Sequence, residues 1–101
     1  MQVITAPGTP LTMTSREIAD LTGKRHADVM RDIRVMCVDL QNANLRFVCK
    51  SSTYTADNEQ QYPQYELDKD TSLTLLLGYD AAARMRVVKR WQELESQQAP
   101  A

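Results

Sequence analysis

The sequence predicts an α+β fold: a winged helix-turn-helix-like domain in which a helix-turn-helix is followed by a β-hairpin and two C-terminal helices. Three observations lead to this prediction. Residues 14–40 have the pattern of a short helix, a glycine turn and a longer helix with one apolar stripe. Residues 45–67 change to β-forming composition with a polar break, as in a hairpin. Residues 70–95 carry two further apolar segments that begin at helix-capping residues.

The chain has the size of one domain, and its 101 residues, 43% of them hydrophobic, can bury a usable core. We divide it into an N-terminal arm (1–12), in which residues 3–5 can form a short edge strand, a domain (13–95) and a polar tail (96–101). No apolar run approaches the ~18 residues of a membrane span, and the start lacks signal-peptide features. We therefore expect no membrane partner and a cytoplasmic location.

The first predicted helix has a defined start and end. Thr14 or Ser15 can cap it, and Thr14 with Glu17 has the spacing of a capping box. Gly23 lies where a left-handed residue would end the helix. The apolar positions of this helix are Ile18, Ala19 and Leu21.

The second predicted helix restarts at Lys24 and ends in the segment 41–44, whose two asparagines tolerate turn geometry. Its apolar residues are spaced 3, 4 and 3 residues apart, which predicts one buried stripe. The stripe consists of Met30, Ile33, Cys37 and Leu40, and Val29 and Met36 widen it.

The predicted hairpin has strands at 45–54 and 62–67, joined by the polar segment 56–61. Phe47 and Cys49 are expected to face inward. Because proline donates no backbone hydrogen bond, Pro63 indicates that the second strand is an edge strand or begins irregularly. A hairpin directly after the second helix is the order of a winged helix, in which the hairpin is the wing.

Two helices are expected to complete the fold. Asp70 or Thr71 would cap the first, which starts at Ser72 and ends at Gly78, and Asp80 would cap the second. The leucines expected to be central to the core are Leu73, Leu75, Leu76 and Leu77. The spacing of the last helix is carried by Met85, Val88, Trp91 or Gln92, and Leu94 or Glu95, with Val87 beside them.

The apolar residues of the last helix have two interpretations. A surplus that so small a core cannot bury would form the interface of a homodimer, or a surface for another partner. Alternatively, the last helix simply closes the core.

The polar face of residues 14–40 suits contact with double-stranded DNA, because the start of the second helix of a helix-turn-helix enters the major groove. Arg25, His26 and Asp28 are candidates for base edges, and Arg31 could reach a base or a phosphate. The alternative is a helical hairpin whose polar face is only solvated. The candidates for contacts to the DNA backbone are Ser15, Arg16, Lys24, Arg34 and, from the hairpin, Lys50.

The net charge of −1 argues against a strongly basic nucleic-acid binder, but the charges are unevenly distributed. Residues 84–90 carry four cations and no acid, whereas residues 57–70 are mainly acidic. A basic face can therefore coexist with a weakly acidic chain. Mixed surface charge that serves solubility is the alternative.

The sequence contains no catalytic pattern, and we expect no enzyme. His26 is the single histidine and has no serine or cysteine nucleophile near it in sequence. The three glycines are isolated, so no phosphate-binding loop is present. Cys37 and Cys49 fit neither a metal site nor a disulfide framework, and we expect free thiols, no metal and no cofactor.

Two blocks of the sequence resemble the Rha family of phage regulatory proteins, over about residues 13–95. The resemblance implies a phage or prophage origin, a bacterial host cell and a role in the regulation of phage development, with DNA binding through a winged-helix-like domain. The hairpin departs from the family pattern because its turn lacks a glycine, and many relatives carry a further C-terminal domain. The first block is SREIADLTGKRH (15–26) with Val29, Arg31, Asp32 and Ile33; the second contains Tyr54, YPQY (62–65), Leu67, Asp70, Leu75, Leu76, Gly78, Tyr79, Trp91, Leu94 and Glu95.

Two hypotheses for the function follow. The first is a transcriptional regulator that binds double-stranded DNA through the winged helix-turn-helix. The second is an antirepressor-like protein-interaction module that binds a phage or host regulator protein, such as a repressor, and not DNA. The near-neutral charge and the acidic hairpin turn favour the second.

Overall fold

The structure is a computed structural model that describes residues 11–98. The strand expected at 3–5 and the last three residues of the tail lie outside the described residues. None of the described helices combines the length and the apolar character that crossing a membrane requires.

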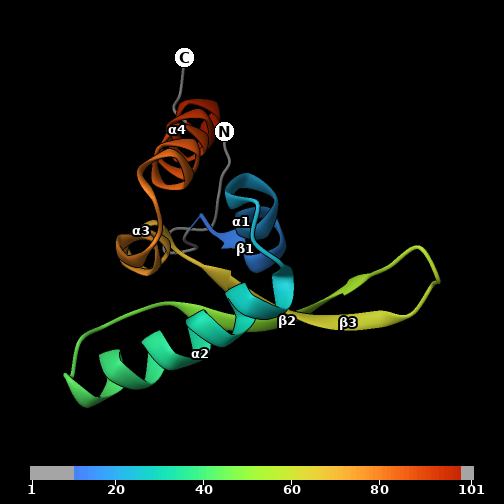
Figure 1. Cartoon of the computed structure of the whole chain (residues 1–101), viewed down its shortest axis with the longest axis horizontal. Helices are drawn as coiled ribbons and strands as arrows, with labels where there is room; N and C mark the ends of the chain where they lie inside the picture. Colours follow the sequence, from blue (N-terminus) through green and yellow to red (C-terminus); the bar gives the residue numbers. More distant parts are fainter. Residues whose placement is uncertain (1–10, 99–101) are drawn as a thin grey trace.

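The described residues form a small α+β fold with four α-helices and one antiparallel sheet (Figure 1). The sheet has the strand order β1–β3–β2, so the strand that ends the hairpin lies in its centre. In chain order the elements are β1 (Met13–Thr14), α1 (Ser15–Thr22), α2 (His26–Asn42), β2 (Cys49–Thr55), β3 (Gln61–Leu67), α3 (Lys69–Leu75), the 3-10 turn η1 (Leu76–Gly78) and α4 (Ala81–Gln98).

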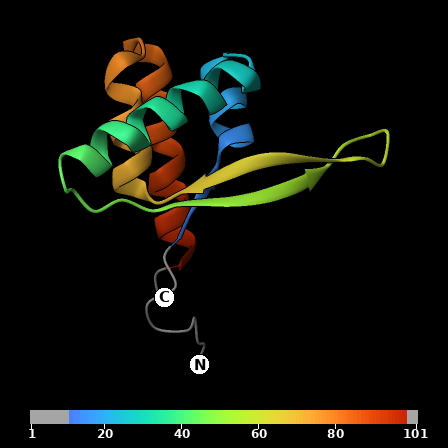
Figure 2. The same cartoon turned by 90° about the horizontal axis from the view of Figure 1, so that it is seen from below.

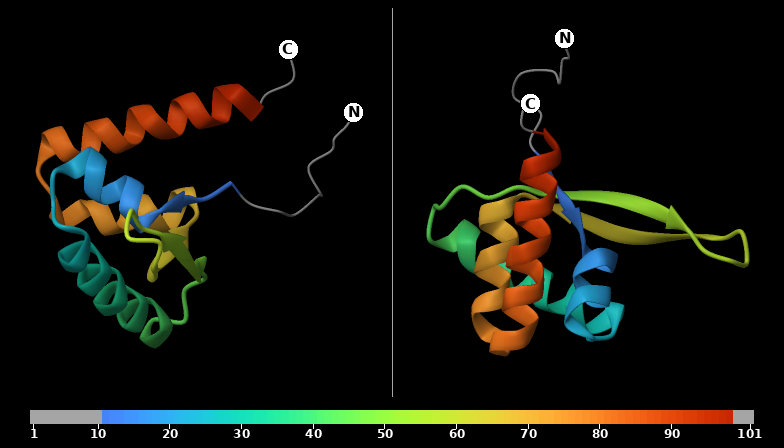
Figure 3. Two further views of the ribbon diagram at one scale, coloured as in Figure 1. Left: turned by 90° about the vertical axis from the view of Figure 1, so that its right-hand side faces the viewer. Right: turned by 90° about the horizontal axis from the view of Figure 1, so that it is seen from above.

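The helices gather at one end of the hairpin β2–β3, and the other end of the hairpin projects well beyond them (Figure 2). The core lies where α1, the first half of α2, α3 and α4 meet the root of the sheet, around the fully buried Trp91 and Leu67. Figure 3 shows α4 running across the helical body with α2 on its far side. The sheet therefore has a packed root and a free hairpin end.

The start and end of α1 agree with the prediction. The Thr14 hydroxyl accepts a hydrogen bond from the Glu17 backbone N–H at 3.1 Å, which identifies Thr14 as the N-cap. Gly23 ends the helix in the left-handed conformation at φ 77°, a conformation that glycine adopts without a steric cost.

The buried stripe of α2 is shorter than predicted. Val29, Met30 and Ile33 are buried, whereas Cys37 and Leu40 are only half-buried. The second half of α2 extends past the rest of the helical body, so fewer neighbours cover it (Figure 1).

The hairpin begins later than predicted. Residues 45–48 form a loop, because Asn44 turns the chain at φ 58° and Leu45 is exposed. The predicted edge position of residues 62–67 holds for only part of the strand, since β3 pairs with β2 along its length and with β1 at its end. Strand β1 reaches only Glu66 and Leu67, however, so β3 still has one open side at Pro63.

The prediction for α3 missed its first turn. Asp68 caps the helix by accepting a hydrogen bond from the Thr71 backbone N–H at 3.0 Å, so α3 begins at Lys69. Leu75 and Leu76 are buried as expected, but Leu77 is exposed because the chain tightens into the 3-10 turn η1 and rotates that side chain outward.

The start of α4 was predicted correctly, and its buried stripe was predicted in part. Asp80 accepts a hydrogen bond from the Ala83 backbone N–H at 2.8 Å. The residues that enter the core are Ala83, Val87 and Trp91, at steps of four residues, so Met85 falls off this stripe and is exposed. The helix continues through Gln98, past the predicted domain boundary at residue 95.

Candidate nucleic-acid interface

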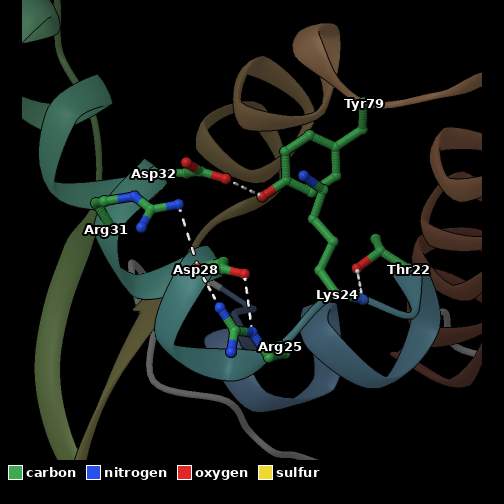
Figure 4. Close-up of polar contacts among 7 residues, drawn as sticks. All are labelled: Thr22, Lys24, Arg25, Asp28, Arg31, Asp32 and Tyr79. Carbon is green, nitrogen blue, oxygen red and sulfur yellow. Dashed lines mark hydrogen bonds and ion pairs between the residues drawn. The ribbon is translucent and has the colours of Figure 1, made fainter.

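The turn between α1 and α2 presents cations to solvent. Arg25 precedes α2 as its N-cap residue, and its side chain makes no capping hydrogen bond to the helix backbone. The Thr22 hydroxyl accepts a hydrogen bond from the Lys24 backbone N–H at 3.4 Å and holds the turn (Figure 4). The hairpin leaves these residues open, since the side chains of Arg25 and Arg31 are 84% and 64% exposed.

Asp28 lies between two of the predicted arginines. Its carboxylate forms ion pairs of 3.2 Å with the guanidinium groups of Arg25 and Arg31 (Figure 4). The hydrogen bond from Arg25 is the main cause that lowers the pKa of Asp28, and the charge of Arg31 adds to it. The predicted base-edge candidates Arg25, Asp28 and Arg31 thus form one connected cluster on the first two turns of α2.

Lys24, in the turn between α1 and α2, packs against an aromatic ring. Its ammonium group lies 4.2 Å from the centroid of the Tyr79 ring, and the Tyr79 hydroxyl donates a hydrogen bond of 2.9 Å to Asp32 (Figure 4). Burial, and then the nearby Asp32 carboxylate, raise the pKa of the Tyr79 hydroxyl, which stays protonated and keeps donating. These contacts fix the turn against the segment that joins η1 to α4.

A second aromatic group joins α1 and α2 to the hairpin. The Arg16 guanidinium lies 3.9 Å from the centroid of the Tyr54 ring, and the His26 ring meets Tyr54 edge-on at a centroid distance of 5.8 Å. Tyr62, across the hairpin, lies 5.9 Å from Tyr54. Arg16 is exposed and therefore remains available to a ligand.

Ser15 cannot contact DNA, because its side chain has no exposed surface. Its hydroxyl lies 2.8 Å from His26 Nε2 and accepts a hydrogen bond of 3.0 Å from the Tyr65 backbone N–H. Ser15 therefore ties α1, α2 and β3 together. The prediction that it contacts a phosphate is wrong, because residues far from it in sequence cover it.

His26 is half-buried at the centre of these contacts. Burial is the main cause that lowers its pKa, the charge of Arg16 lowers it further, and Asp20 opposes both. The neutral ring is therefore favoured at pH 7. A neutral Nε2 can accept a hydrogen bond from the Ser15 hydroxyl. The oxygen of that hydroxyl can then accept the hydrogen bond from the Tyr65 backbone N–H.

The structure places the remaining candidates at the edge of this surface. Arg34 is exposed on the side of α2 that faces the hairpin, where it lines a cleft of about 380 Å³ with Cys37 and Tyr65. Lys50 is exposed on β2 opposite Glu66 of β3, so an acid neighbours it.

The second basic segment, 84–90, is used partly inside the fold. Arg90 forms ion pairs with Glu17 at 2.7 Å and Glu93 at 3.1 Å, and the Arg86 guanidinium donates to the Leu21 carbonyl at 3.2 Å. These contacts join α4 to α1. The pair with Glu17 raises the pKa of Arg90 most.

Ser15 and His26 are separated in the sequence and in contact in the fold, but they do not form a catalytic pair. The Ser15 hydroxyl is buried and no substrate can reach it. Both cysteines are free thiols, and burial, together with the neighbouring Cys37 thiol, raises the pKa of Cys49 to about 12. Over residues 11–98, no three His, Cys, Asp or Glu side chains are grouped so that they could hold a metal ion.

Sequence reasoning missed the tyrosines that position this surface. Tyr54, Tyr62 and Tyr79 were recognised as strand residues or as part of a family motif, and not as supports for Arg16, His26 and Lys24. The available signal was the presence of four tyrosines in a chain with one phenylalanine and one tryptophan, because a hydroxyl-bearing ring suits a partly exposed support.

Comparison with known proteins agrees with the two sequence blocks. The family model described as phage regulatory protein Rha matches residues 13–96. An uncharacterized protein of Haemophilus influenzae (strain Rd) is 29% identical over 79 residues, which are 75% of this chain and 44% of that protein. The chain thus spans less than half the length of this relative. No solved structure matches the chain significantly. The chain belongs to the family of the phage regulatory protein Rha.

Proposed function

We propose that this protein is a phage regulatory protein that binds double-stranded DNA through a winged helix-turn-helix, with α2 as the recognition helix and the hairpin β2–β3 as the wing. The order of elements supports it, because α1 and α2 are joined by a turn of three residues and the hairpin follows them. A transcriptional regulator of phage development would act in the cytoplasm of the bacterial host.

One observation carries the proposal: the cations at the start of α2 lie open to solvent. Arg25 and Arg31 are largely exposed although both are ion-paired, and Lys24 and Arg16 are exposed beside them. Arginine in the first turns of a recognition helix can reach guanine edges, and lysine at the helix start can reach phosphates. The tyrosines beneath Arg16 and Lys24 hold those two cations in place.

Selection of bound fragments from random duplex DNA, followed by affinity measurements on the enriched site, tests the proposal. Arg25→Ala should lower the affinity for that site by ~1–3 kcal/mol. Arg84→Ala, which removes an equally charged and exposed side chain from α4, should leave the affinity nearly unchanged. Unchanged binding by the double variant Arg25→Ala/Arg31→Ala would exclude α2 as the recognition helix.

A protein-interaction module is the second candidate. The ion pairs of Asp28 favour it, because they partly neutralise both arginines, and the hairpin turn is acidic through Asp57 and Glu59. Such a module would bind a repressor or a host regulator without DNA. The two candidates differ in salt dependence, since an apolar protein interface tolerates salt that abolishes phosphate contacts.

The helix α4 exposes fewer apolar side chains for the proposed homodimer than the sequence suggested. Trp91 and Val87 fill the core of the same chain, so Met85 is the large apolar side chain that α4 exposes. A dimer on DNA would select a palindromic site, and sedimentation of the free protein would measure the assembly directly.

A further inference from the structure

The exposed face of α2 continues beyond its arginines as an apolar surface. Val35 and Val38 are 59% and 54% exposed, although each is large and apolar. Both lie on the side of the helix opposite the buried Val29 and Ile33. Single exposed apolar residues are common on proteins, but here two are neighbours on one helix face.

The core does not require these valines, which only border clefts at its edge, Val35 beside Tyr79 and Val38 beside Phe47. An exposed β-branched residue lowers helix propensity relative to alanine, because its side chain loses rotamer freedom against the preceding turn. Neither side chain belongs to the core cluster or to the residues packed against it. Contact with a ligand would account for the exposure of these two side chains.

The spacing of the exposed residues matches that of one class of DNA-reading helix. In homeodomains, whose recognition helix lies along the major groove, the base-reading positions are 3, 1 and 3 residues apart. Arg31, Arg34, Val35 and Val38 have this spacing, and all four are exposed. They span about 10 Å along the helix, which is about three base pairs in length.

The chemistry of these four residues matches a duplex. Arg31 and Arg34 both precede Val35 on the exposed face of α2, and they supply the positive charge that contact with a phosphate-lined groove requires. The apolar feature that the major groove offers is the 5-methyl group of thymine. Valine methyl groups can contact that group and thereby discriminate thymine from cytosine.

We propose that Val35 and Val38 are specificity-determining residues that contact thymine 5-methyl groups in the major groove, beside Arg31 and Arg34. This inference rests on the proposed DNA binding. It assigns to the middle of α2 a role in sequence readout that the predicted site, confined to polar residues, did not include.

Replacement of thymine by deoxyuridine tests this directly, because it removes the methyl group and keeps base pairing. In the site selected by the wild-type protein, each thymine is replaced in turn. At one or two positions the wild-type affinity should fall about fourfold, the factor for one buried methyl-sized group. Val35→Ala or Val38→Ala should cause a similar loss on the thymine site and should abolish the response to deoxyuridine.

Met85→Ala is the matched control, because it truncates a 55% exposed apolar side chain on α4. It should retain the response to deoxyuridine. Alanine favours an exposed helix, so the valine variants should fold, which thermal unfolding checks.

The outcomes separate the two proposals. If every deoxyuridine duplex binds as well as the thymine duplex, the role of Val35 and Val38 is excluded while DNA binding stands. If no duplex is bound at low salt, both proposals are excluded. A change from dimer to monomer in Val35→Asp, with unchanged discrimination of thymine, would assign this face to a second copy of the chain and overturn the inference.

Discussion

At the scale of single residues, Ser15 determines how the candidate site is built. One buried hydroxyl connects the start of α1 with His26 of α2 and with the backbone of β3. Ser15→Ala would leave the Tyr65 N–H and His26 without this partner, so we expect a loss of about 1–3 kcal/mol in the free energy of unfolding. Urea denaturation measures it, with Ser51→Ala on the exposed side of β2 as the control.

His26 gives the molecule a defined pH dependence. Its pKa in the folded protein lies below the ordinary value of 6.5, so the unfolded chain takes up the proton first as the pH falls. The contribution of His26 to stability is therefore full above pH 6.5, decreases as the pH falls through that value and levels off below the folded pKa. The variant His26→Gln isolates this contribution. Between pH 7.5 and 5.5, the free energy of unfolding of the variant should lack the decrease that His26 causes in the wild-type protein.

Asp28 limits the positive charge of the surface that Arg25 and Arg31 form. Asp28→Asn removes one negative charge and weakens both ion pairs, so non-specific duplex DNA should bind severalfold more tightly. Asp39→Asn removes an exposed charge farther along α2 and should have a smaller effect. Equal effects of the two variants would show that only the net charge matters.

At the scale of elements, the turn of the hairpin is under strain. Glu59 has φ 67°, where a side chain is disfavoured and glycine is not. Glu59→Gly should therefore raise the free energy of unfolding by about 0.5–1 kcal/mol, after allowance for the greater freedom of glycine in the unfolded chain.

Asp57→Gly is the matched control for this variant. It removes an acid from the same turn at a position without positive φ, and it should destabilise the hairpin. A gain in stability for both variants would attribute the effect to lost negative charge and not to the backbone of Glu59.

The elements also show what the sequence could and could not predict. The caps at Thr14, Gly23 and Asp80 depend on hydrogen bonds and dihedral angles within a few residues, and all three were predicted. The exposure of Leu77 and Met85 depends on which distant element covers each helix face, which periodicity does not state.

The same reasoning applies to the site. Arg25 and Arg31 were predicted to be open because they are polar residues at the start of an amphipathic helix. Ser15 was misjudged because its burial comes from β3, fifty residues away in sequence. The cation–π contacts of Arg16 and Lys24 likewise join residues that are far apart in the chain, because their partners are Tyr54 and Tyr79.

At the scale of the whole molecule, the packed core is separate from the open surface to which we assign DNA binding. Trp91 is buried at the crossing of α3 and α4 and donates a hydrogen bond of 2.8 Å to Ser72, while Arg90 pairs α4 with α1. The outer face of α2 and the free end of the hairpin carry little of the core. Substitutions on that face should change binding and leave the thermal unfolding temperature nearly constant.

The salt dependence of duplex binding tests the central claim, that the exposed cations at the start of α2 contact DNA. The logarithm of the binding constant should fall linearly with the logarithm of salt concentration. In Lys24→Ala the slope should be smaller in magnitude by about 1, the value for one lost phosphate contact. Binding that does not change with salt, or a slope that Lys24→Ala leaves as it is, would contradict the claim.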